Sequence, residues 1–202
     1  MGCNASFITL FSKKDNLLNL NEFRHISLVR CVYKIIFKIL ATNIKKVLPS
    51  VINLNQSAFL GSRGLLDSIL VANETVDYLK KEKKGGILVK VDFEKAYDSV
   101  DWKFLFYMLK RLGFNDKWIK WIKACMKSAM VSVLVNGSPM EEFKPKRGLR
   151  QGDPLAPFLF IIVVKGLSGL VREAKKANLL SGVEVGRERV QVELLQFANI
   201  QY

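Results

Sequence analysis

The chain has 202 residues, of which half are hydrophobic and a quarter are charged. This length suits one domain or one and a half closely packed domains, and the composition excludes a disordered tail and a bundle of membrane-spanning helices. Lys and Arg number 32 against 18 Asp and Glu, a net charge of +14 that indicates a polyanionic partner. Nucleic acid is favoured because each phosphate that a basic side chain neutralises releases counterions, and an anionic membrane surface is the main alternative.

Cysteine usage and hydropathy indicate an intracellular protein, nuclear or cytoplasmic. Cys3, Cys31 and Cys125 are far apart and His25 has no Cys or His nearby, so neither a zinc site nor a disulfide framework is predicted and the thiols should be buried and reduced. The longest apolar run, residues 155–164, is too short to span a bilayer, and no secretory signal peptide opens the chain. We expect no stable membrane association.

One N-terminal pattern keeps an alternative of another class open. Residues 1–6 (MGCNAS) fit the pattern for N-myristoylation, with Cys3 as a palmitate site. Two acyl chains would make the chain a membrane-anchored interaction module. We expect a chance match over six residues rather than acylation.

The first third of the chain predicts a strand and two helices. Residues 5–13 are apolar and β-prone, and residues 13–16 follow as a basic turn. Helical spacing of apolar residues predicts a helix over 28–40, in a region that Pro49 ends, and another over 65–82. The apolar positions of the first helix are Leu28, Val32, Ile35, Ile36, Ile39 and Leu40. A solvent-exposed basic stripe is expected on the opposite side, at Arg30, Lys34 and Lys38.

The middle of the chain predicts a strand and a pair of capped helices. Residues 87–93 are mostly apolar and predict a buried strand. Asp101 is placed to cap the next helix, which Gly113 ends, and Asn115 or Asp116 is placed to cap another.

The last third predicts a hairpin, a long helix and two short strands. Asn136-Gly137 indicates a hairpin turn within residues 130–148. Asp153 and Pro154 are expected at the N-cap and first position of a helix running to about Asn178. Short strands are predicted near 183–186 and 190–197. The order of elements indicates an α+β fold.

Two stretches carry chemistry. In the first, the predicted strand 87–93 delivers Asp92 at its end, where a carboxylate is rigidly mounted for a hard cation such as Mg²⁺, although an Asp at this position is as often a turn former or helix cap. In the second, residues 146–157 place a basic, glycine-rich loop, with Arg147 and Arg150, before a helix N-terminus. Backbone N–H groups and the helix dipole there favour a phosphate.

These two stretches and two others resemble the reverse transcriptases of LINE-type (non-LTR) retrotransposons. VDFEKAYDSV (91–100) resembles the family's D-(F/Y)-E-K-A-(F/Y)-D-S-V motif, and GLRQGDPLAP (148–157) its G-L-R-Q-G-D-P-L-(A/S)-P loop. NEFRHISL (21–28) resembles F-R-P-I-S-L, with His25 in place of Pro, and QSAF (56–59) with Arg63-Gly64 resembles Q-x-(A/G)-F and G-R. All four motifs occur in the family's order across almost the whole chain.

The resemblance implies a right-hand polymerase fragment: one reverse transcriptase domain over 1–202, with fingers at about 1–86 and a partial palm at about 87–202. A small antiparallel palm sheet would pack on helices, with no thumb. It implies that Asp92 binds Mg²⁺ with help from the Phe93 carbonyl, that Tyr97 lies under the nucleotide sugar, and that Gln151 and Gly152 border the nucleotide pocket. Lys13, Lys14, Arg24, Arg63 and Arg150 would contact template or triphosphate. The expected partners are an RNA template, an RNA–DNA hybrid and a deoxynucleoside triphosphate.

The family's third motif is broken. Its F-A-D-D turn supplies carboxylates to a two-metal site, but here it reads Phe197, Ala198, Asn199 and Ile200. Asp92 is then the only carboxylate of the set that remains, so we expect impaired metal binding and a chain that is inactive or slowed by several orders of magnitude. The chain also ends before the hairpin's partner strand and has no endonuclease domain, which suggests a decayed fragment. A residually active polymerase remains the alternative.

Overall fold

The computed structural model describes residues 4–12, 15, 19, 22–52, 65–89, 91, 93, 95–185 and 190–195. The chain forms two compact units, one made of residues 1–46 and 95–163 and the other of residues 47–94 and 164–202. Each unit is described by itself. None of the described helices is long and apolar enough to cross a membrane.

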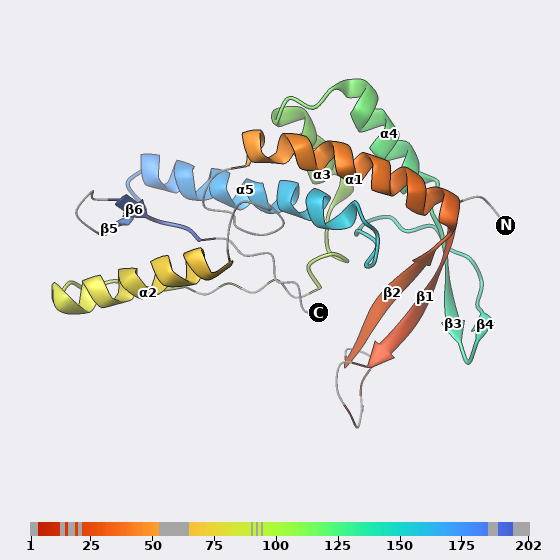
Figure 1. Ribbon diagram of the computed structural model, residues 1–202, viewed down its shortest axis with the longest axis horizontal. Helices are drawn as coiled ribbons and strands as arrows, with labels where there is room; N and C mark the ends of the chain where they lie inside the picture. The colour runs from red at the N-terminus through yellow and green to blue at the C-terminus, as the bar shows by residue number, and fades with distance from the viewer. Residues whose placement is uncertain are drawn as a thin grey trace. The chain divides into compact units, whose positions relative to one another are not determined.

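A four-stranded sheet organises the first unit (Figure 1). The strands β1 (Ala5–Ser12), β2 (Phe23–Val29), β3 (Met130–Val135) and β4 (Ser138–Pro139) lie in the order β2-β1-β3-β4. β1 pairs antiparallel with β2, from Ser6 opposite Val29 to Ser12 opposite Phe23, and parallel with β3, where Ala5 lies opposite Met130. The predicted strand at 5–13 is confirmed. The prediction missed β2, whose end it assigned to a helix beginning at Leu28.

Helix α1 (Cys31–Val51) buries a different side from the predicted one. Its buried residues are Phe37, Leu40, Ala41, Ile44 and Leu48. Val32, Ile35 and Ile39 are 63, 61 and 56% exposed, so the predicted apolar face was wrong except at Leu40. The helix carries apolar residues on two sides, and spacing alone does not distinguish them. It also continues past Pro49, since a proline in the last turn removes only one intrahelical hydrogen bond.

The helices α3 (Trp102–Arg111) and α4 (Asp116–Lys127) form the predicted capped pair. The Asp101 carboxylate accepts a hydrogen bond from the Phe104 N–H at 2.7 Å, and Asn115 Oδ1 accepts one from the Lys117 N–H at 2.9 Å. The apolar sides of the helices bury Leu105, Met108, Leu109 and Ile122. Gly113 ends α3 at φ +80°, a conformation that glycine adopts without steric cost.

The hairpin and the last long helix also follow their local signals. Asn136 and Gly137 connect β3 and β4 at φ +50° and +80°, as a type I′ turn requires. Helix α5 (Ala156–Lys176) begins three residues after Asp153. It ends where Asn178 adopts φ +57° and the Leu179 N–H donates to the Ala174 carbonyl, a Schellman arrangement.

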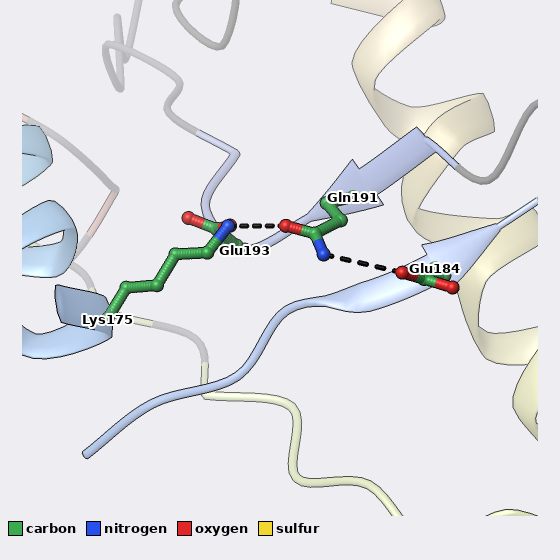
Figure 2. A network of polar contacts seen from close by, with 4 residues as sticks. All are labelled: Lys175, Glu184, Gln191 and Glu193. Atoms are coloured by element: carbon green, nitrogen blue, oxygen red, sulfur yellow. Dashed lines mark hydrogen bonds and ion pairs between the residues drawn. The ribbon is translucent and has the colours of Figure 1, made fainter. Parts of the chain in front are cut away.

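The second unit contains α2 (Leu65–Lys81) and the antiparallel pair β5 (Val183–Val185) and β6 (Val190–Val192). Figure 2 shows the polar network of the pair: the Lys175 ammonium donates to Gln191 and forms an ion pair with Glu193, and Gln191 donates to Glu184. The prediction of two short strands is confirmed, although β6 is shorter than predicted.

The predicted buried strand at 87–93 was wrong. Its described residues, 87–89, 91 and 93, are not in a strand, and Ile87 and Leu88 are 93 and 79% exposed. A strand is stable only beside a neighbour that satisfies its backbone groups, and neither described sheet includes this segment.

The described thiols also differ from the prediction of burial. Cys31 is exposed and Cys125 is half-buried, and both are free. Cys31 is the first residue of α1, and the buried residues of this helix begin further along the chain. Cys3 lies outside the described residues.

The α+β fold class is confirmed, with the small sheet packed on helices. The sheet is mixed rather than wholly antiparallel, because β1 and β3 are parallel.

We predict that Asp101→Ala lowers the free energy of unfolding by about 1 kcal/mol, because the first turn of α3 loses its N-cap. Urea unfolding measures the change. Asp101→Asn is the matched control, since its side-chain oxygen still accepts the Phe104 N–H, and an equal loss in both variants would contradict the capping role.

Candidate active site at the loop before helix α5

The loop at 147–153 is packed on the turn at 95–99 by backbone hydrogen bonds. The Gly148 N–H donates to the Val100 carbonyl and the Leu149 N–H to the Tyr97 carbonyl, both at 2.8 Å. The Trp102 indole N–H donates to the Gly148 carbonyl at 2.7 Å. Gly148 has φ +86°, and a Cβ there would lie 2.9 Å from the Asp98 carbonyl oxygen. Only glycine therefore fits this contact between the two motifs.

The same loop is attached to strand β2. The Gln151 carbonyl accepts a hydrogen bond from the Ser27 N–H at 2.9 Å. Gly152 follows at φ +90° and is exposed, and a Cβ there would lie 3.5 Å from Ile26 and from the Ser27 carbonyl oxygen. The structure thus brings together three of the four resembling stretches: β2, the turn at 95–99 and the loop.

Arg150 holds the loop to the start of β1. Its guanidinium donates to the Asn4 side-chain oxygen at 2.9 Å and to the Asn4 carbonyl at 3.4 Å, and lies 5.8 Å from the centre of the Phe37 ring. Burial lowers the pKa of the guanidinium below its usual value. The Arg150 side chain therefore already has partners within the protein. Its expected contact with template or triphosphate stays a prediction.

Sequence reasoning missed two residues that shape the site, Asn4 and Trp102. The Asn4 amide donates to the Cys125 carbonyl at 2.7 Å and to the Ser128 hydroxyl at 2.8 Å, so this buried residue connects α4 to the loop. No sequence signal indicates Asn4, because its partners are more than 100 residues away. Trp102 had a weak signal, as an aromatic residue directly after a helix cap.

Tyr97 is held by an aromatic neighbour from α5. Its ring stacks on Phe160, with ring centres 5.1 Å apart and an angle of 27° between the planes. Burial raises the pKa of the Tyr97 hydroxyl above its ordinary value, so the phenol is protonated at neutral pH. A fixed, neutral aromatic side chain next to the loop has the chemistry needed to pack against a sugar or a base.

Asp153 caps the start of α5 from a half-buried position. Its Oδ1 accepts the Leu155 N–H at 2.7 Å. Burial raises the pKa of Asp153 to about 6, although the hydrogen bond from Leu155 and the nearby Arg150 act in the opposite direction. The predicted role of Asp153 as a helix cap is confirmed.

A cavity of about 190 Å³ lies beneath the loop. Its polar and charged lining residues include His25, Asp98, Arg147, Gln151 and Asp153. Small-molecule sites usually measure about 300–1,000 Å³, so this cavity is too small for a whole nucleotide.

The described residues contain no group of three or more His, Cys, Asp and Glu side chains that could hold a metal ion. Among the remaining predicted residues, Arg24 lies half-buried in β2 opposite Phe11, and Phe93, in the other unit, is 45% exposed. The rest lie outside the described residues: Lys13, Lys14, Arg63, Asp92, Asn199 and Ile200.

We predict that Gly148→Ala lowers the free energy of unfolding by at least about 2 kcal/mol, the sum of a positive-φ strain and a backbone clash. The matched control is Gly137→Ala, which has a similar φ of +80° and nothing within 4 Å of the added Cβ. Chemical denaturation should show the larger loss at Gly148. Equal losses would mean that the contact with Asp98 is not tight.

We predict that Asp153 makes the fold less stable as pH rises from about 4 to about 6. The folded-state pKa is above the unfolded value of 3.8, so the native state binds more protons in this window and stability falls with rising pH. Asp153→Asn keeps an oxygen for the Leu155 N–H and removes the charge. The stability difference between variant and wild type should therefore grow in favour of the variant by roughly 1–3 kcal/mol between pH 4 and 7. Urea titrations across this range measure it, and a pH-independent difference would contradict the assignment.

The chain matches known proteins over almost its whole length. The reverse transcriptase (RNA-dependent DNA polymerase) family matches residues 11–198. The chain is 26% identical over 199 residues to an uncharacterised 149 kDa protein of transposon TX1 from Xenopus laevis, covering 98% of this chain and 15% of that protein. It is 27% identical over 194 residues to a Pol polyprotein of the retrotransposable element R2 from Popillia japonica, covering 95% and 26%. The chain thus spans about a quarter or less of the length of these relatives.

A solved structure supports the fold. Apo telomerase from Candida tropicalis, truncated from the C-terminal domain, aligns with a TM-score of 0.53 and 16% identity, over 88% of this chain and 41% of that one. At this identity the likeness concerns the fold alone. Sequence motifs, family match and fold agree: the chain belongs to the reverse transcriptase (RNA-dependent DNA polymerase) family, in its LINE-type, non-LTR retrotransposon branch.

Proposed function

We propose that this chain is a fingers and palm segment of a LINE-type reverse transcriptase that binds nucleic acid but has lost nucleotidyl transfer, or retains it at a rate lower by several orders of magnitude. The observation that carries the proposal is the F-A-D-D position, where Asn199 and Ile200 stand in place of two aspartates. The division into fingers at about 1–86 and palm at about 87–202 is part of the proposal.

The chemistry of the donor set supports the loss of activity. Phosphoryl transfer by polymerases relies on divalent metal ions, Mg²⁺ by expectation, held by carboxylates. Asn199 offers a neutral carbonyl oxygen and Ile200 offers none, which leaves Asp92 as the only carboxylate of the set. Asp153 does not replace the lost charges well, because it is half-buried and its carboxylate already accepts the Leu155 N–H.

The loop supports retained binding of a nucleotide or a template strand. Hydrogen bonds to Val100, Tyr97 and Ser27 fix its backbone, so it needs little ordering when a ligand binds. In this proposal Tyr97, Gln151 and Gly152 border the nucleotide and Phe93 supplies a main-chain carbonyl. Lys13, Lys14, Arg24, Arg63 and Arg150 are the proposed phosphate contacts.

The acylation alternative gains no support. The start of the sheet buries Asn4, Ala5 and Ser6. Any acyl chain would therefore have to extend from the sheet on residues 1–3 alone, which lie outside the described residues. It stays a prediction without an observation in its favour.

We predict no detectable primer extension by the natural chain on an RNA template with Mg²⁺ or Mn²⁺. The Asn199→Asp, Ile200→Asp double variant should extend the primer, because it restores the charges that hold the metal ions. Denaturing gel electrophoresis of a labelled primer measures the products.

Two further variants separate the outcomes. Adding Asp92→Ala to the double variant should abolish the restored activity. Extension by the natural chain that Asp92→Ala abolishes would contradict the proposal and show a working metal site. If the double variant is also inactive, the lost carboxylates alone do not explain the defect.

A further inference from the structure

Helices α3 and α4 expose a concentration of positive charge. Between residues 101 and 127 there are seven Lys and Arg residues and two Asp residues, a net charge of +5. Among the described ion pairs, none involves a residue of these two helices. The cations on the exposed sides of α3 and α4 are Lys103, Lys110, Arg111, Lys117, Lys120, Lys123 and Lys127.

Aromatic rings lie among these cations. Phe104 and Tyr107 are 40 and 56% exposed, and their rings stack with centres 6.3 Å apart and 29° between the planes. The Lys123 ammonium lies 5.8 Å from the centre of the Phe106 ring, which joins the exposed side of α4 to that of α3. We call this surface the α3–α4 patch and define it by Lys103, Phe104, Phe106, Tyr107, Lys110, Lys120, Lys123 and Lys127.

Two lysines of the patch, Lys120 and Lys127, lie on the side of α4 opposite the cavity beneath the loop. Ile122 and Cys125 of α4 line the cavity beneath the loop. At 100° per residue, Lys120 and Lys127 lie about 160° around the helix from Ile122 and Cys125, respectively. A ligand on these lysines would therefore occupy a surface of α4 other than the one that lines the cavity.

We propose that the α3–α4 patch binds single-stranded RNA outside the polymerase site. Lysines follow the phosphates, and exposed aromatic faces stack on unpaired bases of any sequence. A duplex fits less well, because its bases already stack on one another. An anionic membrane fits less well too, since the exposed large hydrophobic side chains of α3 and α4 are aromatic and none is aliphatic: Phe104, Tyr107 and Trp121.

The test measures binding of the full chain to a fluorescent 20-nucleotide oligouridine by anisotropy, between 50 and 300 mM salt. The patch variant is Lys103→Gln, Lys120→Gln, Lys123→Gln. The control variant is Lys38→Gln, Lys45→Gln, Lys46→Gln, which removes the same charge from exposed positions of α1. Circular dichroism and thermal melting check that all variants fold.

The patch variant should bind about 30- to 100-fold more weakly at 0.1 M salt, and the slope of log K against log salt should fall by about 2, because three phosphate contacts are lost. The control variant should change affinity less than about threefold. Tyr107→Ala should weaken RNA binding about tenfold and leave binding to an abasic 20-mer unchanged, since only stacking is removed.

Three results would overturn the proposal. Equal losses in the patch and control variants would show an effect of net charge alone. Patch-dependent binding to phosphatidylserine vesicles with unchanged RNA binding would assign the patch to membranes. Tighter binding to a blunt duplex than to oligouridine would exclude the stacking role. These readouts do not depend on primer extension, and the Asn199→Asp, Ile200→Asp variant should bind the oligouridine through the patch like wild type.

Discussion

The hydrogen-bonded pair of buried Asn4 and half-buried Arg150 holds together the sheet, the helix pair and the loop of the first unit. The Asn4 carbonyl accepts the Met130 N–H where β1 begins to pair with β3, and its side chain reaches the end of α4. Arg150 then attaches the loop to the same residue. A hydrogen bond to a charged group contributes roughly 1.5–3 kcal/mol, and a buried amide left without partners costs a similar amount. Sheet, helix pair and loop therefore depend on one another through a residue near the N-terminus.

This dependence explains why the loop has a fixed backbone. It is attached to β1 through Arg150, to β2 through the Gln151 carbonyl and to the turn at 95–99 through Gly148. Each attachment uses a main-chain group or a side chain that the fold already requires. The loop therefore has its conformation before a ligand binds. The candidate binding surface and the fold are therefore maintained by the same interactions.

Local signals predicted local structure well, and interactions between distant residues account for the errors. Asp101, Asn115 and the Asn136-Gly137 turn fixed their elements because the relevant hydrogen bonds span two or three residues. β2 and the segment 87–93 were misassigned because a strand is defined by its neighbour, and α1 was assigned the wrong buried side because two of its sides are apolar. At the site, the motifs indicated the loop and Tyr97, but nothing in the sequence indicated that Arg150 is engaged with Asn4 rather than free.

In a polymerase, affinity for nucleic acid and catalysis differ in their sensitivity to substitution. Electrostatic affinity is a sum over many Lys and Arg side chains, so losing one changes it by a modest factor. Metal-dependent catalysis needs particular carboxylates, and two substitutions at residues 199 and 200 remove most of their charge at once. A chain with a net charge of +14 can thus lose nucleotidyl transfer and keep the charge that attracts a polyanion. If catalysis is lost, as we propose, selection can still act on the basic surfaces. The charge on α3 and α4 does not depend on which residues stand in the third motif.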